Sequence, residues 1–355
     1  MTDGKSGMIK APVFVLESSK LKSNLLAIKS LSKEHSNVVW LYTLKAFDKQ
    51  EGLDIIAKEF DGFSVGNLKE YQKIDRYTSI THTYAPVFYP HEVLQLAKNS
   101  DTMSFNSISQ YDKYAKICSE FTSVGVRINP NLAIKQPPYC DANSSHLGIN
   151  SDIFLSTIEK FALVDGLHFH IFCHQQVEAF LQLLNYIELT YKDILPKLKW
   201  LNFGGGLNFG DKSFEKARFT KAIDDFIKKF PHLRLYLEPA SSVLNGCGYL
   251  ETEVMDIINQ DSKTIAILNT SIETQMLDVA ITKVKPKVRN TLQIKSAYLY
   301  TLAGMSCIAG DIIGDYYFKQ ELRVGDRVVF EDMIGYTLVK QTSFNGLPLA
   351  RFVVV

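Results

Sequence analysis

The fold of this chain is decided by a stretch near its start, VVWLYTLKAF at residues 38–47. Its first seven residues are apolar, aromatic or β-branched, which is typical of a buried β-strand. Lys45 directly follows that run. Runs of the same kind recur farther along the chain, at residues 62–65, 79–85, 102–105, 124–128, 164–169, 199–203 and 233–237. The stretch is therefore the first of eight similar strand-like segments.

Helical patterns separate most of these strands. They lie at residues 21–31, 53–59, 90–97, 108–117, 175–190 and 214–230. Strands that alternate with helices are typical of a parallel α/β sheet, because each helix carries the chain back to the start of the next strand. Eight such strands predict a (β/α)8 TIM-like barrel. An open, doubly wound sheet is the alternative that the pattern leaves open.

The pattern changes after Glu238, where strand-like runs dominate and few long helical patterns remain. The predicted strands lie at residues 249–258, 264–268, 298–303, 326–330 and 337–340. We therefore expect a second, mainly β domain, and the early run at residues 12–16 is expected to be its first strand. The predicted division is a barrel at residues 18–240 and a β domain made of residues 1–17 plus 241–355.

Composition excludes several classes of function. The 355 residues carry a formal net charge of +1, so no global field attracts nucleic acid or an anionic membrane. Residues 1–10 are polar and resemble no signal peptide, and no apolar stretch approaches the length of a membrane span. The five cysteines are odd in number and form no CxxC pair, which argues against a disulfide framework and a structural zinc site. We expect reduced thiols and a cytoplasmic protein with a small-molecule substrate.

Chemically useful residues stand where barrel strands end, which is where barrel enzymes place their catalytic groups. Lys45 follows the first strand, His168 and His170 end the sixth, glycines 204–206 follow the seventh, and Glu238 ends the eighth. Successive glycines allow backbone N–H groups to approach a phosphate. Taken singly, these motifs also fit a surface lysine, a flexible turn and a surface acid.

The β part carries two further candidates. Cys307 and Asp311 lie in a short segment bounded by glycine, and Tyr336 follows a predicted strand. A buried cysteine with a turn aspartate, and a packed tyrosine, are the structural alternatives.

Taken together, these motifs resemble the fold-type III pyridoxal-phosphate (PLP) decarboxylases, the alanine-racemase-like barrel group. Within that group the chain is most similar to the carboxynorspermidine/carboxyspermidine decarboxylases, over nearly its whole length. The similarity is carried by LKAF at 44–47, HFH at 168–170, NFGGG at 202–206, CIAGDIIGDY at 307–316 and FNG at 344–346. The last two segments are the most specific to this family.

The resemblance implies that PLP is the cofactor and that Lys45 binds it covalently. The backbone at Gly204, Gly205 and Gly206 and the hydroxyl of Tyr336 would hold the phosphate, and His170 would stack on the ring. Glu238 would pair with the ring nitrogen, with Arg127 helping to position Glu238. Alanine racemases place an arginine at that nitrogen, so a glutamate there favours decarboxylation.

The resemblance also implies roles near the substrate. Cys307, and Lys45 once it is released, would return a proton to the substrate carbon. Asp311 would bind a substrate amine, and Asp278 and Glu273 are further candidates to pair with ammonium groups. Enzymes of this fold build each site across a homodimer, so Cys307 and Asp311 would come from the partner subunit.

The implied reaction converts carboxynorspermidine or carboxyspermidine to norspermidine or spermidine plus CO2. The chain departs from the family pattern at Ala240, Ser241, Gln275, Leu277 and Gly335, and most of these departures fall where substrate is expected. Another carboxylated amine, or an amino acid of the diaminopimelate, ornithine or arginine class, therefore remains an alternative substrate.

Two other functional classes compete. His168, His170 and His174 could ligate zinc in a barrel hydrolase. Such hydrolases usually carry the His-x-His pair on the first strand, whereas here it is on the sixth, so we expect no metal. A non-catalytic regulatory homologue would lose the lysine or the proton donor, and this chain retains both Lys45 and Cys307.

Overall fold

The computed structural model describes residues 12–135, 137, 145–260 and 263–355. The predictions for residues 1–11 and for Cys140 lie outside this range. The chain forms two compact units, one of Lys22–Val243 and the other of residues up to Leu21 together with Leu244–Val355. Both boundaries between the units fall a few residues after those expected from the sequence.

The first unit is a closed barrel of eight parallel strands, as predicted. The strands pair in the order β5-β4-β3-β2-β10-β9-β8-β6, and pairing of β5 with β6 closes the ring. The barrel strands are β2 Val38–Thr43, β3 Gly62–Val65, β4 Ile80–Tyr84, β5 Thr102–Phe105, β6 Ser123–Asn129, β8 Gly166–His168, β9 Trp200–Asn202 and β10 Arg234–Leu237; the short β7 Ile149–Asn150 extends beside β6.

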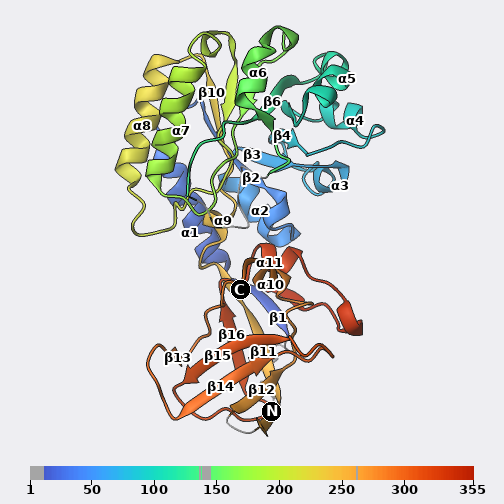
Figure 1. Cartoon of the computed structure of the whole chain (residues 1–355), viewed down its shortest axis with the longest axis vertical. Helices are drawn as coiled ribbons and strands as arrows, with labels where there is room; N and C mark the ends of the chain where they lie inside the picture. Colours follow the sequence, from blue (N-terminus) through green and yellow to red (C-terminus); the bar gives the residue numbers. More distant parts are fainter. Residues whose placement is uncertain (1–11, 136, 138–144, 261–262) are drawn as a thin grey trace, which may run out of the picture. The chain divides into compact units, whose positions relative to one another are not determined.

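Helices connect the barrel strands, and α7 and α8 lie side by side (Figure 1). Their bounds are α1 Ser18–Lys29, α2 Gln50–Glu59, α3 Leu68–Tyr71, α4 Val93–Lys98, α5 Ile108–Cys118, α6 Ser151–Ser156, α7 Val177–Thr190, α8 Lys216–Lys229 and α9 Ser241–Leu244. Inside the barrel, Trp200 packs with Val39, Leu41 and Tyr236. A Cβ at residue 166 would lie 2.0 Å from the Trp200 ring, so the glycine on β8 makes room for this core.

The second unit is mainly β, and its strand β11 is the centre of the sheet. This strand pairs with β1, β12 and β16, and β1 pairs in turn with β17. The predicted strand at residues 12–16 therefore belongs to this unit. The strands are β1 Val13–Leu16, β11 Gly248–Gln260, β12 Lys263–Leu268, β13 Thr291–Leu292, β14 Tyr298–Ala303, β15 Ile312–Phe318, β16 Arg327–Glu331 and β17 Arg351–Val354.

Two expectations about local structure were wrong. Residues predicted as a strand at 337–340 form instead the helix α11 Tyr336–Val339, which contacts α10 Leu277–Thr282. Gly335, with φ 131°, turns the chain immediately before α11, and the short apolar run then packs as one helical turn. The expectation of reduced thiols holds for Cys118, Cys247 and Cys307, whereas Cys173 is disulfide-bonded.

Candidate active site

The ends of the barrel strands surround a cavity of about 370 Å³. Because all strands of a parallel barrel run in one direction, residues that follow different strands meet at the same end. The cavity thereby brings together four residues predicted from sequence. These are Lys45, Arg127, His170 and Glu238.

Lys45 lies in a single helical turn, Leu44–Ala46, directly after β2. Leu44 and Ala46 are buried, and they anchor the turn so that the lysine side chain enters the cavity. The amine is accessible through the cavity, but the surrounding walls remove much of its hydration and lower the pKa of Lys45. Glu238 opposes this shift and Arg127 adds to it. A lysine with a lowered pKa has more of the neutral amine that attacks an aldehyde.

Glu238 is held in place by two side chains from neighbouring strands. Asn202 Nδ2 donates to its Oε1 at 2.7 Å, and Thr43 Oγ1 donates to its Oε2 at 3.3 Å. The carboxyl group is almost fully buried. Both donors fix the orientation of the carboxylate, and neither supplies a compensating positive charge. The site therefore suits a ligand that brings a proton or a cation to Glu238.

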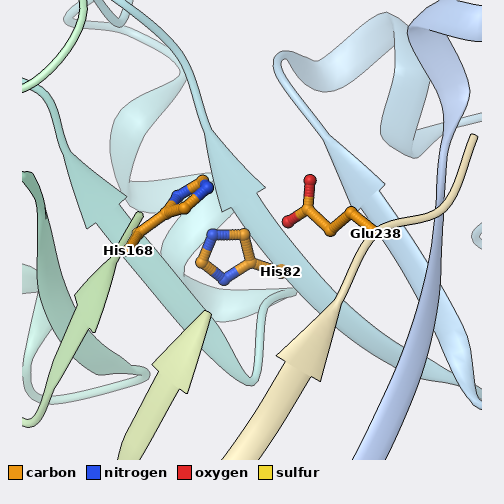
Figure 2. A group of neighbouring side chains, drawn as sticks. All are labelled: His82, His168 and Glu238. Atoms are coloured by element: carbon orange, nitrogen blue, oxygen red, sulfur yellow. The ribbon is translucent and has the colours of Figure 1, made fainter. Parts of the chain in front are cut away.

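Two histidines face Glu238 from β4 and β8. Figure 2 shows the carboxyl group of Glu238 directed toward the rings of His82 and His168. Burial lowers the pKa of His82 to about 4 and lowers the pKa of His168 well below its ordinary value, so both rings are neutral near pH 7. His82 Nδ1 bonds to Thr102 Oγ1 at 2.7 Å. Both ring nitrogens of His168 are buried without a hydrogen-bond partner in the described part of the chain.

The predicted zinc trio of the hydrolase alternative does not come together. Over the described residues, the one group of three that could hold a metal is His82, His168 and Glu238, with ligand atoms within 4.8 Å of one another. His170 and His174 are not in that group, and His174 is exposed on the loop before α7. The hydrolase alternative therefore loses the ligand set on which it rested.

The glycines after β9 form a tight cradle beside His170. A Cβ at Gly204 would lie 2.3 Å from His170 Nδ1, and one at Gly205 would lie 2.2 Å from the Glu238 carbonyl oxygen. A Cβ at Gly206 would lie 2.1 Å from the carbonyl oxygen of Phe172. Any larger residue would displace this backbone. A close backbone turn of this kind is the feature expected for phosphate binding through N–H groups.

The orientation of the His170 ring is set by this cradle. Gly205 N donates to His170 Nδ1 at 2.9 Å. Burial lowers the pKa of His170 well below its ordinary value, so the ring is neutral and its proton lies on Nε2. The carbonyl oxygen of His170 accepts from Arg127 Nη2 at 3.0 Å. The imidazole is thus fixed as a flat neutral surface in the cavity wall.

Arg127 lies inside the barrel wall rather than directly on Glu238. Its guanidinium lies over the ring of Tyr84, 4.7 Å from the centroid, and also bonds to the backbone at His170. Burial lowers the pKa of Arg127, but an arginine remains charged in proteins. Arg127 therefore contacts His170 and Tyr84, and its effect on Glu238 is through charge.

These residues fit a phosphorylated pyridine aldehyde. The cavity offers an amine with a lowered pKa for the aldehyde and a fixed carboxylate for a ring nitrogen, and the glycine cradle beside His170 suits a phosphate. Glu238 lacks a cationic hydrogen-bond partner among these contacts, and a protonated ring nitrogen would supply one. The donor set of the cavity is therefore that of a PLP site.

Sequence reasoning missed several residues that line or support the cavity, and Glu70 is the most important of them. Burial raises the pKa of Glu70, its Oε2 accepts from Gly66 N at 2.6 Å, and the nearby Lys45 charge opposes the shift. Asn67 Oδ1 accepts from Glu70 N at 3.0 Å, which makes residues 67–70 a capping pattern, Asn-x-x-Glu. That pattern, directly after a predicted strand, is the signal that could have located Glu70. Other missed residues are Thr43, Tyr84, His82 and Asn202.

The remaining predicted residues belong to the sheet unit. Cys307 is exposed, and its backbone N donates to Asn345 Oδ1 at 2.7 Å. Asp311 is only 2% exposed, and its two carboxylate oxygens accept from Ile272 N at 2.9 Å and Ser306 N at 3.0 Å. The thiol is therefore open to ligands, whereas the carboxylate is already occupied by backbone donors.

Asp278, Glu273 and Tyr336 also have partners inside this unit. Asp278 forms an ion pair with Lys340, and the amine of Lys340 lies 5.0 Å from the centroid of the Tyr336 ring. Glu273 accepts from Ser271 Oγ at 2.8 Å and is partly exposed. Their predicted contacts with phosphate and substrate stay predictions.

Two of the departures from the family pattern have structural roles. Gln275 is buried, accepts from Ser271 N at 3.1 Å and donates to the Pro348 carbonyl oxygen at 2.8 Å. Gly335 has φ 131° and ψ −135°, a conformation that glycine alone adopts without strain. Both residues shape the backbone around the segments at 344–348 and 336–339. Nothing in the structure explains Ala240, Ser241 or Leu277.

None of the helices in the part of the chain that the structure describes has the length and apolar character that a membrane span requires.

Comparison with known proteins gives consistent matches. Residues 79–334 match the family described as pyridoxal-dependent decarboxylase, C-terminal sheet domain. The carboxynorspermidine/carboxyspermidine decarboxylase of Campylobacter jejuni is 31% identical over 362 residues, covering 98% of this chain and 93% of that protein. The carboxyaminopropylagmatine decarboxylase of Synechocystis is 31% identical over 344 residues, covering 96% of this chain and 88% of that protein.

A solved structure is similar over the same length. The crystal structure of carboxynorspermidine decarboxylase with norspermidine, from Campylobacter jejuni, matches with a TM-score of 0.88 and 31% identity. The match covers 98% of this chain and 94% of that one.

Proposed function

Since the chain belongs to the pyridoxal-dependent decarboxylases, we propose that it removes CO2 from a carboxylated polyamine. The observation that carries the proposal is the barrel cavity, which is lined by an amine of lowered pKa, a fixed carboxylate and His170. The glycine cradle lies beside His170, where Gly205 N donates to His170 Nδ1. Carboxynorspermidine and carboxyspermidine are the first candidates, because a similar enzyme over nearly the full length carries their names.

A second substrate, carboxyaminopropylagmatine, is supported by the equally similar Synechocystis enzyme. Both candidates place a carboxyl group beside an amine and end in further cationic groups. The departures at Ala240, Ser241 and Leu277 are where a difference in substrate could arise. The two substrates differ in their distal group, a primary amine in one and a guanidinium in the other.

We assign the cofactor contacts as follows. Lys45 Nζ would bind PLP covalently, the backbone at residues 204–206 and the Tyr336 hydroxyl would hold its phosphate, and His170 would contact its ring. Glu238 would accept a hydrogen bond from the ring nitrogen and keep that nitrogen protonated. When bound, PLP supplies an electron sink for the electron pair left behind as CO2 departs.

The chain itself supplies the remaining steps. The amine of Lys45 can also carry a proton when it is not bonded to the cofactor. Cys307 and Lys45 are the groups that we propose to return a proton to the substrate carbon. Asn202 and Thr43 hold the Glu238 carboxylate in one orientation.

We further propose that the chain acts as a homodimer, in which the segment containing Cys307 serves the barrel of the partner subunit. The exposed thiol and the exposed side chains of Met305 and Ile308 support this proposal, since an isolated proton donor in open water would have no advantage over solvent. Sedimentation of the purified protein at several concentrations tests the dimer. The cytoplasm, as the place of action, stays a prediction.

A CO2-release assay tests the function. The panel comprises carboxynorspermidine, carboxyspermidine, carboxyaminopropylagmatine, diaminopimelate, ornithine, arginine and lysine. We expect the highest kcat/KM for one of the three carboxylated polyamines. A preference for diaminopimelate, ornithine, arginine or lysine would contradict the proposed substrate class, and no release from any of them would favour the non-catalytic alternative.

A further inference from the structure

We propose that Asp311 is a positioning residue that fixes the loop carrying Cys307, and that it is not a ligand of the substrate amine. The inference rests on the proposed function, because it concerns the proton donor of the same reaction. It replaces the substrate-binding role expected for Asp311 from sequence.

The loop between β14 and β15 is built around the Asp311 side chain. Asp311 Oδ2 accepts from Ser306 N at 3.0 Å, one residue before Cys307, and Oδ1 accepts from Ile272 N at 2.9 Å in the segment after β12. The carboxylate therefore ties the loop to a second part of the sheet unit. Since hydrogen bonds to a charged acceptor are stronger than neutral ones, this is a firm connection.

The main chain of Asp311 closes the same loop. Its carbonyl oxygen accepts from Gly304 N at 2.9 Å, and its N donates to the Ile308 carbonyl oxygen at 3.0 Å. A Cβ at residue 304 would lie 2.2 Å from Asp311 Oδ2, so the carboxylate packs directly against the glycine. These contacts leave no space for another ligand on that side.

Burial separates the two roles of the loop. Asp311 is 2% exposed, whereas the Cys307 side chain is exposed. A substrate ammonium would have to compete at the carboxylate with Ile272 N and Ser306 N, and a backbone N–H group that loses its partner inside the protein destabilises the fold. In this geometry Asp311 fixes the backbone of the loop, and the exposed side chain of Cys307 is the group that can contact a ligand.

Asn345 provides a second, weaker anchor. Its Oδ1 accepts from Cys307 N at 2.7 Å, and its own backbone is left-handed, with φ 59°. Asparagine and aspartate tolerate that conformation better than most residues. The Phe-Asn-Gly segment therefore binds the backbone of Cys307, the proposed proton donor.

The test compares Asp311→Asn with Asp315→Asn, an exposed carboxylate on the adjacent strand β15, in the full-length holoenzyme. Asparagine keeps the size but loses one acceptor. We expect Asp311→Asn to lower kcat roughly 10- to 100-fold with KM nearly unchanged, and to release less amine product per CO2, because a misplaced proton donor misdirects protonation. In the absence of substrate, backbone hydrogen exchange in residues 304–311 should be faster in Asp311→Asn than in wild type. Asp315→Asn should match wild type in all four measurements.

A large rise in KM with unchanged kcat and unchanged exchange would overturn the proposal and restore Asp311 as an amine ligand. If Asp311→Asn does not fold, Asn345→Gly and Asn345→Asp decide the question. Glycine and aspartate both tolerate the left-handed backbone at residue 345, but only glycine lacks a side-chain oxygen to accept from Cys307 N. Only Asn345→Gly should therefore speed hydrogen exchange and lower kcat. Wild-type exchange in Asn345→Gly would likewise overturn the proposal.

Cys307→Ala separates this inference from the proposed function. A wild-type rate in Cys307→Ala would remove Cys307 from proton return, which is a failure of the proposed function. Faster exchange in Asp311→Asn tests the loop independently of that result.

Discussion

The barrel cavity and the Cys307 loop present reactive side chains by different physical means. In the cavity, Lys45 and Glu238 follow parallel strands, and burial shifts the pKa of Lys45 downward. In the loop, the thiol is exposed, and a buried carboxylate beneath it holds the backbone through N–H groups. The cavity therefore depends on the environment of each functional group, whereas the loop depends on a residue that need not touch the substrate.

The largest expected effect is in the cavity. Lys45→Ala removes the amine that binds the cofactor, so CO2 release should fall on the order of 10⁴-fold or more. Borohydride reduction should no longer attach the cofactor to the protein. Lys69→Ala, which removes an exposed lysine on α3, serves as the control and should retain full activity. Turnover at the wild-type rate in Lys45→Ala would end the proposed mechanism.

Glu238→Gln tests whether the carboxylate acts through its charge. Glutamine keeps a carbonyl oxygen for the hydrogen bond from Asn202, but it cannot hold a proton on the ring nitrogen. We expect kcat to fall roughly 10²- to 10³-fold while the cofactor remains bound, as judged by its absorbance. A decrease below about threefold would show that the site works without a protonated ring.

Gly204→Ala in the barrel is compared with Gly246→Ala in the sheet unit, because the two glycines have nearly the same φ angle. Their φ angles are 64° and 68°, but a Cβ at Gly204 would lie 2.3 Å from His170, whereas a Cβ at Gly246 would have no atom of the described residues within 4 Å. Gly246→Ala should cost ~1–2 kcal/mol of unfolding free energy from its backbone alone. Gly204→Ala should cost a further ~1–3 kcal/mol and weaken PLP binding. Equal losses in denaturant unfolding and in PLP titration would exclude a role for the tight cradle.

Arg127→Met is expected to have the smallest effect, and it concerns pH. Burial is the main cause of the lowered pKa of Lys45, and the Arg127 charge lowers that pKa further. Removing the charge should therefore raise the pKa of Lys45, reduce the neutral amine near pH 7, and slow PLP uptake by the apoprotein a few-fold. The midpoint of uptake rate against pH should move to higher pH. A shift to lower pH would contradict this electrostatic account.

Much of the barrel and its site could be predicted because the signals are local. The run at 38–44, the glycines at 204–206 and Glu238 each carry their meaning in a few residues, and parallel strands bring their ends together. The strand predicted at 337–340 failed for the opposite reason. Residues 337–340, of which Leu338 and Val339 are apolar, fit a strand or one helical turn equally well, and packing of α11 against α10 decides between them.

Supporting residues were harder to predict, because each acts through a partner that is distant in sequence. Asn202 and Thr43 hold Glu238 from two other strands, and Gly66 binds Glu70 through a backbone donor. The disulfide at Cys173 likewise contradicted an argument based only on the number of cysteines. Such contacts depend on distances in the folded chain, and the order of residues along the sequence does not give these distances.

The amino-acid sequence by itself determined the alternation of strands and helices, the family, and the identity of the lysine, glycines and glutamate, because strand period and strand ends are local properties of the chain. Only the tertiary structure decided how these groups behave. Burial is set by the whole barrel, so the pKa of Lys45, the unpartnered ring of His168 and the fixed carboxylate of Glu238 emerge only after folding. For the same reason, only the folded sheet brings Ile272 and Ser306 to the two carboxylate oxygens of Asp311, and the proposed positioning role of Asp311 rests on these contacts.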